Sequence, residues 1–317
     1  FVLYKSKAAR RGDGSEHLPR HFNVNLGDSW LGATADDNPE NYTVGRDQAL
    51  ILPAERPGDP APAGDLQAYL RYQLKEAREG FGPVVDGRFP RADKHESRRW
   101  TLGNEWGEIV VDTRKVTALW VPAGAASDAG ALPDPAERTV LKCYKTKIAR
   151  GVSAGQLADG KLRRDLQSFF RDWFDDCATF ADGTSSFVEA HDVAGMCLID
   201  LHRLGELCNP VTLANVTEGR PTSAAVTESA PATEQSLLCY RVRLAKKANS
   251  GAIADLIDVE PGDRIPRQAK HVRRTQRAGT SVFTMPGHAF PAPLDVETKK
   301  LEALCLPTTV LSVEALP

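Results

Sequence analysis

The chain has 317 residues, a length typical of about two domains. Its 40 Lys and Arg residues nearly balance 42 Asp and Glu residues, which leaves a net charge of −2 and argues against a dedicated nucleic-acid binder, since such proteins carry a basic excess. Hydrophobic residues make up 41% of the chain and charged residues 26%, a composition that excludes a disordered tail. No apolar run is long enough for a transmembrane helix. The chain opens on the strand-like Phe1–Tyr4 segment rather than on Met, which we interpret as removal of a leader or as the start of the ordered part.

Two motifs recur along the chain. An opening motif, Cys-Tyr-basic-x-basic, begins at Cys143 and again at Cys239. A closing motif, Leu-Cys-x-Pro, contains Cys208 and Cys305. The separation between the opening and the closing Cys is nearly the same in both copies. Two independent motifs at matched spacing indicate an internal repeat.

A third copy, without cysteines, precedes these two. Leu3 stands where the opening motif has Cys, and Trp120 stands where the closing motif has Cys. Because both cysteines are missing from the same copy, we interpret the two positions as touching one another. This predicts the disulfides Cys143–Cys208 and Cys239–Cys305, with a packing contact between Leu3 and Trp120 in the first copy.

Two cysteines remain inside the second copy. Cys177 and Cys197 are predicted to form a third bridge, although no other copy reports on this pair. The alternative is six buried free thiols in a cytosolic protein, since spacing alone does not fix connectivity. Disulfides persist in oxidising compartments, so the bridges predict a secreted or cell-surface protein.

The repeats predict a mainly β protein made of three tandem β-sandwich-like or barrel-like units with helical insertions, two of them closed by a disulfide. We place these units at residues 1–123, 138–213 and 236–317. Residues 123–137 and 214–235 are linkers rich in small and polar residues, and the second is a flexible tether or an extended segment on another surface. The first and last strands of a bridged unit are expected to be neighbours in one sheet or to face each other in a sandwich.

Two insertions have the apolar spacing of an amphipathic helix. The first covers about residues 64–80, and the second covers Asp165–Cys177. Each stripe is expected to dock on its own sheet or on a neighbouring subunit. The stripe residues are Leu66, Tyr69, Leu70 and Leu74 in the first and Leu166, Phe169, Phe170 and Trp173 in the second.

The two motifs resemble a tandem repeat domain of largely uncharacterised secreted bacterial proteins. In that family a Cys-Tyr-Lys strand starts each unit and a Leu-Cys-x-Pro strand ends it. The resemblance covers the edges of the second and third copies, and the first more weakly; the middle of each unit departs from the family pattern. It implies an extracellular, β-rich, non-enzymatic module, and it offers no catalytic residues.

No catalytic or cofactor motif stands out in the sequence. It lacks a haem-attachment motif, zinc-finger cysteine spacing, a nucleophile elbow and a phosphate-binding Gly loop, so we expect no catalytic residue, no cofactor and no metal. His17 and His21 are separated by Pro19, which disfavours a helical metal pair. The acidic group Asp172, Asp175 and Asp176 is expected to be a solvated face, because its spacing does not match a calcium loop.

The strongest charge feature is the segment 264–277, which holds six basic residues and no acidic residue. If the segment is helical, most of these side chains share one side. It is either a solvated basic face or a docking surface for an acidic polysaccharide, for nucleic acid outside the cell, or for an acidic patch on a neighbouring copy. The six residues are Arg264, Arg267, Lys270, Arg273, Arg274 and Arg277.

These observations favour a non-enzymatic extracellular structural protein, a self-assembling surface or filament subunit whose partner is itself or another cell-surface component. Open strand edges would let copies join by main-chain pairing. The alternative is a monomeric cell-surface binding or adhesion module for an anionic glycan or protein. A secreted hydrolase is a weaker alternative.

Overall fold

The structure is a computed structural model of the chain. It describes residues 1–8, 22–28, 30, 40–56, 68–80, 84–88, 91, 94–126, 139–151, 155–158, 160–172, 196–218, 235–257, 259–265, 268, 271–279 and 294–316.

Most of the described residues lie in β-strands. In chain order the strands are β1 (Val2–Ala8), β2 (Phe22–Asp28), β3 (Glu40–Leu52), β4 (Ala54–Glu55), β5 (Ala68–Glu76), β6 (Arg98–Asn104), β7 (Gly107–Ala126), β8 (Val140–Ile148), β9 (Leu157–Ala158), β10 (Lys161–Leu162), β11 (Gln167–Asp172), β12 (Cys197–Glu218), β13 (Ser236–Leu244), β14 (Arg274–Gly279) and β15 (Leu294–Ala315). The short helix α2 (Gly251–Leu256) packs its buried Ile253 and Ala254 beside Phe169 and Leu198. None of the described helices has the length and apolarity needed to span a membrane.

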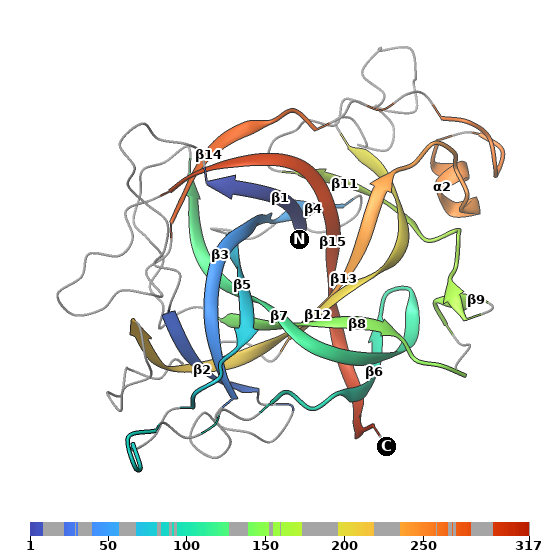
Figure 1. Cartoon of the computed structure of the whole chain (residues 1–317). Coiled ribbons are helices and arrows are strands. Elements are labelled where there is room, and N and C mark those ends of the chain that lie inside the picture. The colour runs from blue at the N-terminus through green and yellow to red at the C-terminus, as the bar shows by residue number, and fades with distance from the viewer. Residues whose placement is uncertain are drawn as a thin grey trace.

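The strand pairings close eight of these strands into a ring, which we call the strand ring and which is seen in Figure 1. Around it, β1 is followed by β3, β5, β7, β8, β12, β13 and β15, and β15 pairs with β1 again; every pairing is antiparallel. The opening motifs lie on β1, β8 and β13, and the closing motifs lie on β7, β12 and β15. We call these the opening and the closing strands. Each closing strand therefore lies beside the next opening strand.

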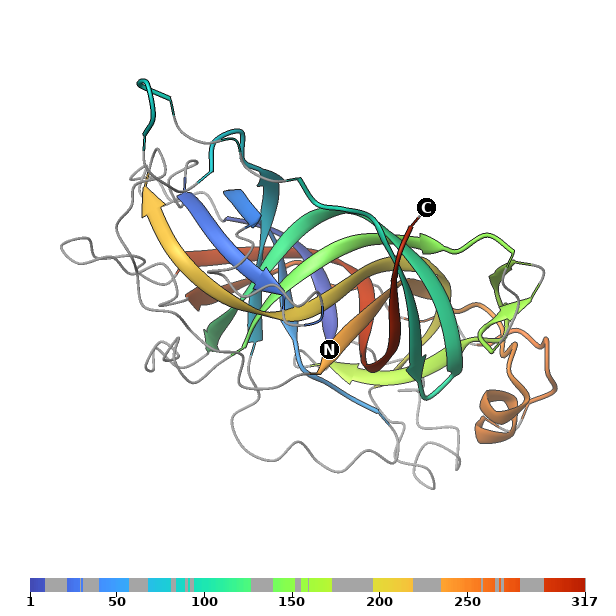
Figure 2. The ribbon, with the colours of Figure 1, turned by 90° about the horizontal axis from the view of Figure 1, so that it is seen from below.

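The closing strands are long and curve out of the ring to pair with further strands (Figure 2). Beyond the ring, β2 bridges β3 and β12, while β6 and β14 each bridge β7 and β15. β11 pairs with β12 and with β4. The whole arrangement is one large antiparallel sheet, with a separate two-stranded sheet of β9 and β10.

Side chains alternate between two faces of the ring, as the two-residue period of a strand requires. One cluster takes residues from all eight ring strands, from Leu3 on β1 to Cys305 on β15, and we call its side the inner face. Eight strands leave an interior just wide enough for side chains to fill. The opposite side, the outer face, carries a much larger apolar cluster that includes residues of β2 and β6.

The opening motif uses both faces. Its Cys or Leu points inward, and the Tyr that follows points outward and is buried. Tyr4 stacks near His271 with ring centroids 4.5 Å apart, and Tyr144 lies 6.3 Å from Trp100. Tyr240 meets Trp106 edge to face at 5.3 Å. The tyrosine of the motif thus packs each opening strand against segments outside the ring.

The expectation of three separate units is not what the structure shows. All three segments contribute strands to the same sheet, because each closing strand pairs with the opening strand of the next segment. The second linker begins later than expected, since residues 214–218 extend β12 and pair with β2. Residues 219–234 lie outside the described part of the chain.

The prediction of a helix was wrong for both insertions, in the parts that the structure describes. Residues 68–76 form β5, on which Tyr69 belongs to the inner cluster and Leu70 to the outer one. Phe169 and Phe170 are likewise split between two clusters on β11. A strand buried on both faces carries apolar residues at consecutive positions, and here that pattern imitates a helical stripe. Leu66 and Trp173 lie outside the described residues.

Candidate functional site

Two disulfides lie on the inner face, with the predicted pairing. Cys143 and Cys208 join β8 to β12 with an S–S distance of 2.03 Å. Cys239 and Cys305, which face each other in the register of β13 and β15, are joined at 2.15 Å. Each bridge links an opening strand to the neighbouring closing strand. Cys197 on β12 is also disulfide-bonded, while its expected partner Cys177 lies outside the described residues.

The first segment is built differently, and this explains its missing cysteines. Between its opening strand β1 and its closing strand β7 the ring contains β3 and β5. Leu3 and Trp120 both belong to the inner cluster, but they lie on strands that are not neighbours. A bridge of the kind seen in the other two segments needs adjacent strands.

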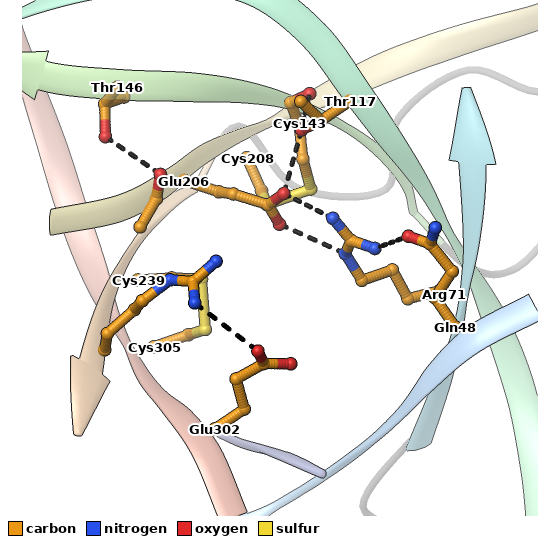
Figure 3. A network of polar contacts seen from close by, with 12 residues as sticks. Gln48, Arg71, Thr117, Cys143, Thr146, Glu206, Cys208, Cys239, Glu302 and Cys305 are labelled. Atoms are coloured by element: carbon orange, nitrogen blue, oxygen red, sulfur yellow. Dashed lines mark hydrogen bonds and ion pairs between the residues drawn. A yellow bond between two sulfur atoms is a disulfide. The ribbon is translucent and has the colours of Figure 1, made fainter. Parts of the chain in front are cut away.

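A polar layer lies next to the bridges. The Arg71 guanidinium donates to both carboxylate oxygens of Glu206, with 3.2 Å between Nε and Oε2, and the two side chains are only 14% and 15% exposed. Thr117 Oγ1 donates to Glu206 Oε1 at 2.8 Å, and Arg71 also donates to Gln48 (Figure 3). β5 and β12 are three strands apart around the ring, so this ion pair crosses its interior.

Beside this layer the sheet carries three pairs of like charges, which we call the basic rim. Lys300 on β15 faces Lys5 on β1, and Lys115 on β7 faces Lys145 on β8. Arg203 on β12 faces Arg241 on β13. All six side chains are exposed. In each pair the opening-strand residue stands two positions after the inner-face Cys or Leu, so all three pairs share the inner side and the same level of the ring.

Such an arrangement opposes stability. Like charges directly opposite each other in an antiparallel sheet repel. Among the described residues, Arg241 forms an ion pair with Glu302 at 3.5 Å, and Lys145 also faces Glu206 in the register of β8 and β12. The positive charge of the rim acts on His202, which lies beside Arg203 at a register shift of β12. Partial burial, followed by repulsion from Arg203 and Arg243, lowers the pKa of His202 below its ordinary value. A positive potential of this kind attracts an anion.

The segment 264–277 is not helical where it is described. Arg274 and Arg277 lie on β14, and Arg264 lies in a bridge with Lys247. Arg264, Arg273, Arg274 and Arg277 are exposed, as expected of a basic surface. The residues of this segment and of the acidic group that lie outside the described residues are Arg267, Lys270, Asp175 and Asp176, as are His17 and His21. Asp172 is a residue of β11 rather than of a helix end.

The basic rim was missed although its residues belong to the motifs used to find the repeat. Lys5, Lys145 and Arg241 are the first basic residues of the opening motifs. Their spacing by itself fits ordinary strand alternation. The sequence does not give the strand register, and it is the register that places a second basic residue opposite each of these three.

The chemistry offered by these groups is electrostatic. Among the described residues, the side chains close enough to share a metal are Cys143, Cys208 and Glu206, but the two sulfurs are bonded to each other and offer no thiolate. The chain matches no known family model, no curated protein and no solved structure.

Proposed function

We propose that the protein is a non-enzymatic, secreted binding module whose basic rim takes an anionic glycan, carboxylated or sulfated. The observation that carries this proposal is the repetition of a destabilising pair of like charges at three corresponding register positions. Unfavourable charge that recurs on an exposed surface is typical of a binding site.

The spacing of the charges favours an extended ligand over a small ion. The three pairs lie on three different strand boundaries of the ring, and β3 and β5 widen the distance along the ring between β1 and β7. A polymer with several anionic groups engages several pairs at once, which multiplies weak individual contacts.

The compartment favours a glycan over a nucleic acid. Disulfides are typical of oxidising, extracellular environments, and the net charge of −2 lacks the excess expected of a nucleic-acid binder. The resemblance of the two motifs to secreted repeat domains points the same way.

Self-assembly by strand addition has less support. Each of the eight ring strands already pairs on both sides. A strand that is paired on both sides offers no free edge to a second copy.

The test compares two charge reversals of equal size. Arg203→Glu with Arg241→Glu alters the rim, whereas Arg273→Glu with Arg274→Glu alters the exposed basic segment that precedes and begins β14. Calorimetry with a sulfated glycosaminoglycan oligosaccharide at several salt concentrations measures the affinity. We expect the rim variant to weaken binding by about tenfold or more, with a shallower salt dependence, because attractive charges become repulsive. The β14 variant is expected to bind like the parent.

Equal losses in both variants, or tighter binding to a DNA oligonucleotide of equal charge than to the glycan, would overturn this function.

A further inference from the structure

A second polar cluster lies on the outer face, beneath β2. Lys142 on β8 and Asn209 on β12 are direct register partners. Both are 0% exposed, and Asp28 at the end of β2 is 1% exposed. A fully buried lysine is rare, because an ammonium group loses its hydration. The disulfide pair Cys143 and Cys208 fixes the position of Lys142 and Asn209, since these cysteines are the next residues along the same two strands.

The Asn209 side-chain amide is held from both ends. Its Nδ2 donates to Asp28 Oδ2 at 3.2 Å, and its Oδ1 accepts from Ser236 Oγ at 2.9 Å. Asp28 also accepts from the Tyr144 hydroxyl. A carboxylate therefore lies at the nitrogen of the amide, and a hydroxyl donor lies at its oxygen.

The Lys142 amine reaches into the same cluster. Its Nζ lies 5.2 Å from the centroid of the Tyr144 ring and 5.8 Å from that of Tyr42. The hydroxyl of that same Tyr144 is the donor to Asp28. The amine and the carboxyl group thus both lie against Tyr144, and the amide is hydrogen-bonded to that same carboxyl group. These residues have almost no contact with solvent.

From this geometry we propose that Lys142 and Asn209 join in an intramolecular amide bond. The unprotonated Nζ of Lys142 attacks Cγ of Asn209 and forms a new C–N bond. Asp28 accepts a proton from the attacking nitrogen and delivers it to Nδ2. The bond between Cγ and Nδ2 then breaks, and Nδ2 leaves as ammonia. One C–N bond forms and one breaks, so the step needs no oxidant, reductant or metal.

Each neighbour has a definite part in this step. The Ser236 hydroxyl stabilises the negative charge that develops on Oδ1. Asp28 is the acid and base, and it lies within hydrogen-bond reach of the leaving nitrogen. Tyr144 holds Asp28 in place. Register pairing of Lys142 with Asn209 supplies the proximity that makes an otherwise slow aminolysis intramolecular.

The residue after Asn209 removes a competing reaction. An asparagine amide that loses ammonia ordinarily cyclises onto the backbone nitrogen of the next residue. Here that residue is Pro210, whose nitrogen carries no hydrogen. Lys142 is therefore the nucleophile left for this amide.

The bond is tested by the intact mass of the purified full chain, measured after reduction and denaturation. We expect a mass lower than that of the sequence by one ammonia. Trypsin should fail to cut after Lys142, and tandem mass spectrometry should find the peptides containing Lys142 and Asn209 joined. The full sequence mass, with free peptides on both sides, would overturn the proposal.

Variants separate the roles. Lys142→Arg and Asn209→Ala should each have their full sequence masses, whereas Asn209→Asp should lose water in place of ammonia. Asp28→Asn should keep most chains unjoined, and joining as complete as in the parent would contradict its assigned role. Lys147→Arg on the same strand is the matched control and should keep the ammonia loss. A non-reducing peptide map that finds the Cys143–Cys208 bridge shows which variants have folded.

Discussion

The inner and outer faces of the strand ring are made by the same strands but held in different ways. The inner face is a small cluster in which two disulfides, Trp120 and a crossing ion pair meet. The outer face is a broad apolar layer covered by further strands. The inner face has little area to bury, and it is held by covalent bonds and by a charge pair that is mostly shielded from solvent. The outer face has abundant area and relies on packing. Where burial is limited by geometry, cross-links take over its role.

The difference between the two faces can be tested most strongly on β7, where the neighbouring residues Leu119 and Trp120 point to opposite faces. Trp120→Ala should lower the free energy of unfolding by about 3–5 kcal/mol, because it empties the inner cluster. Leu119→Ala, on the outer face, should cost about 2–5 kcal/mol. Urea denaturation measures both. A loss below about 1 kcal/mol for Trp120→Ala would contradict a packed inner face.

Removal of a bridge is expected to have a similar effect. Cys239→Ala with Cys305→Ala should cost about 4 kcal/mol in the chain-entropy model, given the 66-residue separation of the two cysteines. Reductant should then destabilise the parent but add less to the variant. If the variant is as stable as the parent in oxidising buffer, packing alone holds the inner face.

The crossing ion pair should follow the rule for buried charges. Glu206→Gln should cost about 1–3 kcal/mol, since it leaves the Arg71 guanidinium without its carboxylate. The double change Arg71→Met with Glu206→Met should cost less than either single change, because no buried charge remains. Thermal unfolding of the three variants measures the difference, and simple additivity would argue against a coupled pair.

Removing a like-charge repulsion from the basic rim should raise the free energy of unfolding, whereas the preceding changes lower it. Lys5→Glu places an acid opposite Lys300 and should stabilise the fold by about 0.2–1 kcal/mol. The same change should weaken binding of a sulfated glycan. Lys7→Glu is the matched control, because Lys7 already pairs with Glu297 at 3.0 Å and its reversal should destabilise. A rim variant that gains stability and keeps its affinity would separate the rim from binding.

The smallest effect is a shift in one pKa. The pKa of His202 is lowered in the folded chain by burial and by Arg203 and Arg243, so the unfolded chain binds a proton more readily. The stability contributed by His202 is therefore present above its unfolded pKa and is lost as the pH falls through and below it. A bound polyanion should raise the pKa towards its ordinary value, as NMR titration of the imidazole would show. An unchanged pKa at saturation would place the ligand elsewhere.

The sequence predicted the two disulfides correctly, but it did not predict the arrangement of the strands. Paired loss of cysteines gave both bridges correctly, because a disulfide constrains two positions at once. It did not reveal the insertion of β3 and β5 between β1 and β7. Tyr69, Leu70 and Leu74 fit a helical period as well as a strand buried on both faces, and only the tertiary pairing decides between them.

The sequence itself contains a signal for the cluster of Lys142 and Asn209. Antiparallel pairing of residue 143 with residue 208 places residue 142 opposite residue 209, on the other face of the sheet. Each predicted bridge thus implies a flanking pair. In the third segment the same positions hold Leu238 and Leu306, which is an ordinary apolar pair. The polar pair of the second segment is the exception, and its burial becomes visible only with the outer strands in place.

The bridges also divide the chain into stretches that respond differently to a broken backbone. A peptide cleaved between Cys143 and Cys208, or between Cys239 and Cys305, remains one covalent molecule under oxidising conditions. A cut between residues 219 and 234 falls in neither of these two loops. The two fragments it creates are joined by neither bridge, and contact each other through the pairing of β13 with β12 and of β15 with β1 and β6. The protein can therefore be divided at that segment into two complementary halves, each with its own internal cross-link, whose reassembly would rebuild the ring.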